Sequence, residues 1–250
     1  MVQYGFYFDP GRCATCHTCT VACKDWNGVP PGPAKWIRIY KWEEGAFPTP
    51  RLNVVFATCY HCQNPVCLDA CPNHAIYKEE KYGAVLIDHQ KCKGARQCYL
   101  ACPYGSVMFQ SDAFGTQAEM CTMCIDRLEQ GDKPICVMAC NFRALDFGPL
   151  SELKAKYGTN SQLAGMPSPT LTQPSIIFKP RDAVPRKQLL PYDTSKALTL
   201  FAQRPDGLTP NYASASDVTT IPSGLIKRNK LVLKPGTAAE IMEYTKDDEG

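Results

Sequence analysis

The segment Cys13-Ala-Thr-Cys16-His-Thr-Cys19-Thr-Val-Ala-Cys23 decides the fold of this 250-residue chain. Its four cysteines are separated by two, two and three residues. Three later groups repeat the pattern with small changes in spacing, and each also ends in a CxxxC step: Cys59–Cys62–Cys67–Cys71, Cys92–Cys98–Cys102 and Cys121–Cys124–Cys136–Cys140. The four groups hold all 15 cysteines of the chain. The cysteines are therefore a repeated unit and not a scattered set.

Closely spaced cysteines that end in a CxxxC step are typical of bacterial ferredoxins, in which the last cysteine of one group binds the neighbouring cluster. The four groups therefore predict four iron–sulfur clusters. Disulfides are the weaker interpretation, because they are typical of small secreted domains in oxidising compartments. Structural zinc uses CxxC pairs and does not require a third and a fourth cysteine at this repeated spacing. The four histidines are scattered, and we expect loop residues and not ligands at His17, His61, His74 and His89.

The third group lacks one cysteine. In the full pattern the absent residue falls at Ala95, between Cys92 and Cys98. An alanine methyl group cannot bind iron, and a cubane corner without a protein ligand tends to lose its iron. We therefore expect a 3Fe–4S cluster beside Ala95. The alternative is a 4Fe–4S cluster that carries water or hydroxide on one iron.

The ligand sets follow from the way a ferredoxin fold exchanges the last cysteine between two groups. Four groups pair most simply as outer with outer and inner with inner. The expected ligands are then Cys13, Cys16, Cys19 and Cys140 for cluster 1; Cys23, Cys121, Cys124 and Cys136 for cluster 2; Cys59, Cys62, Cys67 and Cys102 for cluster 3; and Cys71, Cys92 and Cys98 for cluster 4. This scheme predicts three 4Fe–4S clusters and one 3Fe–4S cluster.

Short apolar runs beside the cysteine groups predict an α+β fold of two pseudo-symmetric, bacterial ferredoxin-like modules. Strands are expected at Gly5–Phe8, Ile37–Tyr40, Val54–Thr58, Val85–Asp88, Val107–Phe109 and Leu145–Phe147. Short helices are expected at Thr18–Lys24, Val66–Ala70, Gln97–Ala101 and Thr122–Gln130. Pro72 and Pro103 come straight after the last cysteine of their groups, where proline ends a helix.

The chain changes character after Tyr157. Residues 1–157 are expected to form the tandem ferredoxin-like four-cluster domain, and residues 158–250 an extended, Pro-rich C-terminal arm. This second segment has ten prolines between Pro167 and Pro235. Recurring apolar residues favour an arm that packs on a partner subunit over a disordered tail. They are Ile176, Ile177, Phe178, Leu189, Leu190, Tyr192, Leu200, Phe201, Leu231, Val232 and Leu233.

Composition and motifs argue against several other functions. The net charge is only +3 at pH 7, and the chain has no basic stripe of the kind that binds nucleic acid. The N-terminal residues lack the basic and apolar regions of a secretory signal, and no apolar run approaches the length of a membrane span. The sequence has no nucleophile with a base at a recognisable spacing, no glycine-rich phosphate loop and no open metal triad. We therefore expect no catalytic site in this chain, and a role in electron transfer.

Two stretches resemble one family of proteins. They are Met1-Val-Gln-Tyr-Gly-Phe-Tyr-Phe-Asp-Pro-Gly-Arg-Cys13 with Val21-Ala-Cys23-Lys-Asp25, and Cys121-Thr-Met-Cys124-Ile-Asp-Arg127 with Pro134-Ile-Cys136-Val-Met-Ala-Cys140 and Arg143-Ala-Leu-Asp-Phe-Gly148. They resemble the iron–sulfur subunits of the dimethyl sulfoxide reductase family of molybdenum or tungsten bis-pterin oxidoreductases. The resemblance covers residues 1 to about 157. The chain departs from it at Ala95, where members similar to dimethyl sulfoxide reductase have cysteine, and at Asn141, where proline is usual.

This resemblance implies an electron-transfer β subunit. Its partners would be a catalytic molybdenum or tungsten bis-pterin α subunit and a membrane quinone subunit or another carrier, without nucleic acid. The complex would be associated with the membrane, on the periplasmic or outer face after export together with the α subunit, or else in the cytoplasm. The alternatives are a similar subunit of a hydrogenase or formate dehydrogenase complex, and a free polyferredoxin carrier.

Overall fold

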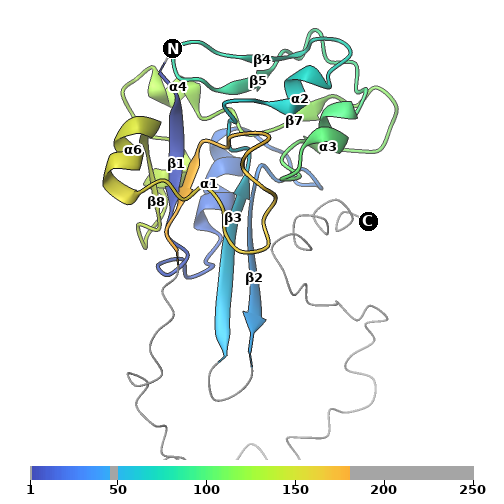
Figure 1. Ribbon diagram of the computed structural model, residues 1–250. Helices are drawn as coiled ribbons and strands as arrows, with labels where there is room; N and C mark the ends of the chain where they lie inside the picture. Colours follow the sequence, from blue (N-terminus) through green and yellow to red (C-terminus); the bar gives the residue numbers. More distant parts are fainter. Residues whose placement is uncertain (1, 46–49, 181–250) are drawn as a thin grey trace, which may run out of the picture. The chain divides into compact units, whose positions relative to one another are not determined.

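The computed structural model describes residues 2–45 and 50–180 (Figure 1). The elements are, in chain order, β1 (Tyr4–Phe8), α1 (Thr18–Trp26), β2 (Ile37–Glu44), β3 (Arg51–Thr58), α2 (Val66–Asp69), β4 (Ile76–Lys78), β5 (Val85–Ile87), α3 (Gln97–Ala101), β6 (Met108–Phe109), β7 (Ala118–Glu119), α4 (Ile125–Leu128), α5 (Ile135–Met138), β8 (Leu145–Pro149), α6 (Leu150–Tyr157) and β9 (Ile176–Phe178). All the expected strands are present, although several of their ends differ.

The outer parts of the chain come together, and so do the inner parts. β1 pairs antiparallel with β8, so that Phe6 lies opposite Phe147, and α1 packs against α5. In the inner part, α2 packs against α3, and β4 pairs antiparallel with β5. Each module therefore combines two cysteine groups, which confirms the two-module α+β fold predicted from the sequence.

The hairpin of β2 and β3 is longer than the apolar runs suggested. Its ladder extends from the pair Ile37 and Thr58 to the pair Glu44 and Arg51, and Figure 1 shows it as the long ribbon in two shades of blue. The end near Ile37 is buried, whereas Glu44 and Arg51 are exposed. Because the exposed end carries polar side chains, its hydrophobic signal stops before its hydrogen-bonded ladder does.

β1 has two apolar faces, as alternation of side chains along a strand allows. Phe6 and Phe8 are buried in the large core that also contains most of the buried cysteines. Tyr7 faces the other way and packs with residues of α6 and β9. Gly5 is required by a close approach, because a Cβ atom there would lie 2.4 Å from the carbonyl oxygen of Ser175. A central strand with both faces covered explains why this short run is almost entirely apolar.

The segment after α6 departs from the expected domain boundary at residue 157. β9 pairs in parallel with β1, with Ile177 opposite Tyr7, and its three residues are at most 1% exposed. The apolar run Ile176–Phe178 therefore completes the sheet β8-β1-β9 of this chain, and its side chains are buried in this chain's own core. The remainder of the expected arm, residues 181–250, lies outside the described residues, so its contact with a partner stays a prediction.

Two features of the helices differ from the expectation. The helix expected at 122–130 is limited to α4, because Met123 and Cys124 adopt positive φ angles of 59° and 49° that belong to a cysteine turn. The helices α5 and α6 were not expected. They follow Pro134 and Pro149, and proline is favoured where a helix starts because its φ is already suitable. Within residues 2–45 and 50–180, none of the helices is long and apolar enough to cross a bilayer.

Candidate iron–sulfur sites

The structure gathers the cysteines around cavities. One cavity is lined by Cys13, Cys16, Cys19 and Cys140. A second is lined by Cys59, Cys62, Cys67 and Cys102. The third is lined by Cys71, Cys92 and Cys98 together with Ala95. Each of these three cavities thus has the cysteines that the sequence predicted for one cluster.

The remaining four cysteines are also neighbours. Burial raises the pKa of Cys136 well above its usual value, and the negative charges of Cys121, Cys124 and Cys23 raise it further. Such mutual effects require the sulfur atoms to lie close together. The structure therefore brings together Cys23, Cys121, Cys124 and Cys136, which is the set expected for cluster 2.

The arrangement of these thiols fits a cluster better than a single ion. All 15 cysteines are free thiols in the structure. The sulfur atoms stand around the walls of the cavities. This placement suits a cubane, because its irons lie at separate corners and each takes one thiolate.

The electrostatics of the cavities call for a cationic occupant. Burial raises the pKa to about 12 for Cys19, Cys62, Cys67 and Cys121, and to about 11 for Cys98. The ligand form of cysteine is the thiolate. Several thiolates in one dry cavity repel one another and lose their hydration, so they need positive charge between them. An iron–sulfur core supplies iron cations at that place, and the donor set therefore fits the cofactor.

The cysteine that ends each group accepts a hydrogen bond from the residue four positions later. The backbone donors are Ala75 to Cys71 at 3.3 Å, Ser106 to Cys102 at 3.5 Å and Ala144 to Cys140 at 3.3 Å. In the first group the side-chain amide of Asn27 takes this role, with 3.6 Å between its Nδ2 and the Sγ of Cys23. Hydrogen bonds to sulfur stabilise the thiolate and help to set the potential of a cluster.

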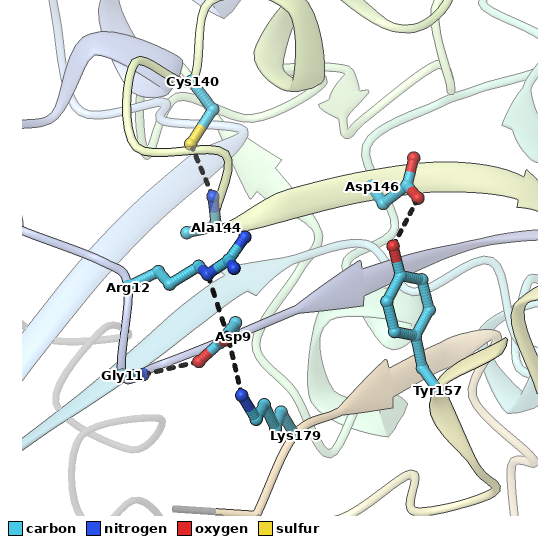
Figure 2. A network of polar contacts seen from close by, with 8 residues as sticks. All are labelled: Asp9, Gly11, Arg12, Cys140, Ala144, Asp146, Tyr157 and Lys179. Atoms are coloured by element: carbon cyan, nitrogen blue, oxygen red, sulfur yellow. Dashed lines mark hydrogen bonds and ion pairs between the residues drawn. The ribbon is translucent and has the colours of Figure 1, made fainter.

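A polar network holds the turn before Cys13 against the end of the fourth group (Figure 2). The buried carboxylate of Asp9 accepts a hydrogen bond from the backbone N–H of Gly11 and forms an ion pair with Arg12. The backbone N–H of Asp9 donates to the carbonyl of Ala144 at 2.8 Å, and the N–H of Ala144 donates to Cys140. Ala144 therefore connects the end of β1 to Cys140, which lines one of the cavities.

The inner module repeats this network. Asp88 accepts a hydrogen bond from the backbone N–H of Gln90 and pairs with Lys91. Its own N–H donates to the carbonyl of Ala75 at 2.7 Å, and the N–H of Ala75 donates to Cys71. Sequence reasoning missed both networks, although the repeated spacing of an aspartate, a basic residue three positions later and then a cysteine could have revealed them.

This repetition relates the cavity around Cys16 to the cavity around Ala95. The flanking residues have φ angles of 54° and 60° around Cys16, and of 71° and 63° around Ala95. Cys16 and Ala95 are themselves both exposed. The turn at Ala95 therefore has the same left-handed conformation as the turn at Cys16, although its side chain cannot bind iron.

His61 has a packing role in the structure. Its ring is fully buried, and its Nδ1 accepts a hydrogen bond from the backbone N–H of Val85 at 3.0 Å. Burial lowers the pKa of His61 to about 3, so the ring is neutral at physiological pH. It is not among the residues that line the cavity of Cys59, Cys62, Cys67 and Cys102. His17, in contrast, lines the cavity of Cys13, Cys16, Cys19 and Cys140, so the expectation that the histidines are not ligands stays a prediction.

Comparison with known proteins identifies relatives over most of the chain. Two models of 4Fe–4S dicluster domains match residues 12–76 and 51–150. One chain of the anaerobic dimethyl sulfoxide reductase of Escherichia coli (strain K12) is 40% identical, with 71% of this chain and 89% of the relative aligned. One subunit of the sulfite dehydrogenase of Allochromatium vinosum is 35% identical, over 61% and 71%. The beta subunit of the selenate reductase of Thauera selenatis is 29% identical, over 78% and 86%.

Proposed function

Because this protein belongs to the family of iron–sulfur electron-transfer subunits of dimethyl sulfoxide reductase-type molybdenum or tungsten bis-pterin oxidoreductases, we propose that it connects a catalytic molybdopterin subunit to a quinone-reactive membrane subunit or another carrier. Four iron–sulfur clusters, bound in a row, would supply the one-electron chemistry. The chain itself would hold, space and tune them, and would not transform a substrate.

The proposed ligands are the four cysteine sets of the sequence scheme, Cys13/Cys16/Cys19/Cys140, Cys23/Cys121/Cys124/Cys136, Cys59/Cys62/Cys67/Cys102 and Cys71/Cys92/Cys98. The observation that carries this proposal is that three of these sets line separate cavities and the fourth is mutually close. Each CxxxC step contributes its two cysteines to different sets. Only three residues of backbone therefore separate a ligand of one cluster from a ligand of the other cluster in the same module, which keeps the two close enough for fast electron transfer.

The junction between the two modules is also short. The charge of Cys121, from the proposed cluster 2, is among the causes that raise the pKa of Cys59, from the proposed cluster 3, after burial and the two nearer cysteines of its own set. A side-chain hydrogen bond with Thr58, which precedes Cys59, lowers the pKa of Cys121 against the larger effect of burial. This proximity supports a continuous row of four clusters in the order 1, 2, 3, 4, in which clusters 2 and 3 are neighbours across the junction of the two modules.

Cluster 4 is proposed to be a 3Fe–4S cluster. The support is that three cysteines and Ala95 line its cavity, and that the turn at Ala95 matches the turn at the ligand position Cys16. A 3Fe–4S cluster differs from its neighbours in charge and therefore in potential. Cluster 4 would then be the high-potential end of the row.

The partners and the location are further parts of the proposal. Relatives whose names include dimethyl sulfoxide reductase, sulfite dehydrogenase and selenate reductase favour a molybdoenzyme partner over a hydrogenase or a free carrier. We propose that the complex is associated with the membrane through another subunit, on the periplasmic face or in the cytoplasm.

Iron and sulfide analysis of the anaerobically purified complex tests the cluster count. Four thiolates in three sets and three in the fourth imply about fifteen irons per chain. Electron paramagnetic resonance of the oxidised protein should show the near-isotropic signal of a 3Fe centre, because oxidised 4Fe clusters of ferredoxin type are silent. A content near eight irons would refute the four-cluster arrangement, and the absence of a 3Fe signal would refute the assignment of cluster 4 alone.

A further inference from the structure

Arg38 on β2 is a buried cation that has no carboxylate partner among residues 2–45 and 50–180. Only 6% of the surface of Arg38 is exposed. One terminal N–H group donates to the carbonyl of Gly105, and the other donates to the Sδ of Met108 at 3.2 Å. Its Nε is buried and has no hydrogen-bond partner in the part of the chain that the structure describes. Arg38 also forms no ion pair with any described residue.

A buried arginine is ordinarily paired, because the loss of its hydration costs several kcal/mol. The positive charge of Arg38 acts on Tyr60. Burial raises the pKa of Tyr60 far above its ordinary value, and the charge of Arg38 only partly opposes this increase. Tyr60 is therefore neutral and does not balance the charge. The positive charge of Arg38 is therefore not balanced by a described residue. An anionic group nearby would balance it, and a cubane with four thiolates is anionic.

One peptide unit joins Arg38 to a cysteine of the proposed cluster 3. The carbonyl of Gly105 accepts the hydrogen bond from Arg38, and the N–H of the same peptide unit, that of Ser106, donates to the Sγ of Cys102 at 3.5 Å. A cation on the carbonyl polarises the peptide and strengthens its N–H as a donor. Among the described contacts, the corresponding peptides before Ala75 and Ala144 carry no such cation.

We propose that Arg38 raises the reduction potential of cluster 3 above the value that its thiolates alone would give. This inference rests on the proposed function of the chain. Reduction adds one negative charge to the cluster, and a fixed positive charge nearby favours the reduced state. Solvent and salt screen this effect poorly because Arg38 is buried. Two routes contribute, which are the direct charge interaction and the polarised hydrogen bond to Cys102.

The test is a redox titration of the complete complex, followed by electron paramagnetic resonance, for the native protein and Arg38→Met. Methionine keeps an unbranched chain and removes the charge. We expect the equilibrium constant for reduction of one cluster to fall at least tenfold, which is about 59 mV for one electron, while the other three keep their potentials. The affected signal should be the one that Cys102→Ser removes or alters. Arg38→Lys should retain most of the native potential.

Arg51→Met is the matched control, because Arg51 is exposed at the far end of the same hairpin. It should leave all four potentials unchanged. Unchanged potentials in Arg38→Met, or an equal shift in Arg51→Met, would overturn the inference. If Arg38→Met does not assemble, Arg38→Gln keeps a donor for the Gly105 carbonyl, and the same criterion applies to it. Fewer than four clusters in the native complex would instead refute the proposed function.

Discussion

Substitution of Ala95 by cysteine should complete the ligand set of cluster 4. The backbone around Ala95 already has the left-handed turn found around Cys16, so the new side chain needs no rearrangement of the backbone. Ala95 is also exposed and lines the cavity with three cysteines. A thiol placed at this corner would supply a ligand for the iron position that the proposed ligand set of cluster 4 leaves without one.

The expected size of the change follows from the ligand count. One added thiolate retains one added iron, so that the content per chain should rise from about fifteen to about sixteen. The near-isotropic 3Fe signal of the oxidised protein should disappear, and the potential of cluster 4 should fall. The free energy of unfolding should change by no more than about 0.5 kcal/mol, because the position is at the surface.

Iron analysis and electron paramagnetic resonance of the anaerobic complex measure these outcomes together. Gln90→Cys is the control, because Gln90 is exposed just before the same group and does not line the cavity. It should add a thiol without adding iron. A persistent 3Fe signal in Ala95→Cys, with unchanged iron, would refute the equivalence of Ala95 and Cys16.

Three further substitutions or treatments test other parts of the structure. Asp146 accepts hydrogen bonds from two lysines and from the hydroxyl of Tyr157 at 2.7 Å (Figure 2). Burial opposes ionisation of Asp146, but these partners lower its pKa, so Asp146→Asn should lose about 1–2 kcal/mol at pH 7 by denaturant unfolding. The contribution of a lowered pKa is complete above the unfolded pKa of about 4 and is lost as the pH falls from there towards the folded pKa, so the difference in unfolding free energy should shrink below about pH 4. Gly94→Ala should reduce the iron content of cluster 4 and lower the free energy of unfolding by about 1–3 kcal/mol, because the new Cβ would lie 2.4 Å from the carbonyl oxygen of Thr116. Unchanged iron content and unchanged stability would contradict this. Limited proteolysis should cut residues 181–250 in the isolated subunit and spare them in the complex, whereas equal cutting would argue against contact with a partner.

The sequence predicts the strands and several of the short helices beside the cysteines, although it misses α5 around Cys136; where it succeeds, the reason is local. A cysteine turn such as the one before α3 is set by spacing within a few residues, and the expected helix Gln97–Ala101 is the observed one. The grouping of cysteines around cavities was also predictable, because exchange of the last cysteine leaves few pairings. Local spacing thus carries both the secondary structure and the candidate sites.

Contacts between distant segments could not be predicted in the same way. The apolar run Ile176–Phe178 predicts burial, but the sequence does not indicate which surface buries it. In the structure this run pairs with β1 at the edge of this chain's own sheet. Arg38 gave no signal at all, because its role depends on the position of Gly105, 67 residues away. The two aspartate networks are a middle case, since their spacing repeats although their partners lie far along the chain.

The nesting of one module inside the other has a consequence for biogenesis. In the proposed scheme every ligand of clusters 3 and 4 lies between Cys59 and Cys102, whereas clusters 1 and 2 combine Cys13–Cys23 with Cys121–Cys140. The ribosome therefore exposes a complete inner set before the outer set can exist. Assembly should proceed from the inside outward, and the N-terminal thiols must stay reduced while they wait for their partners to be translated.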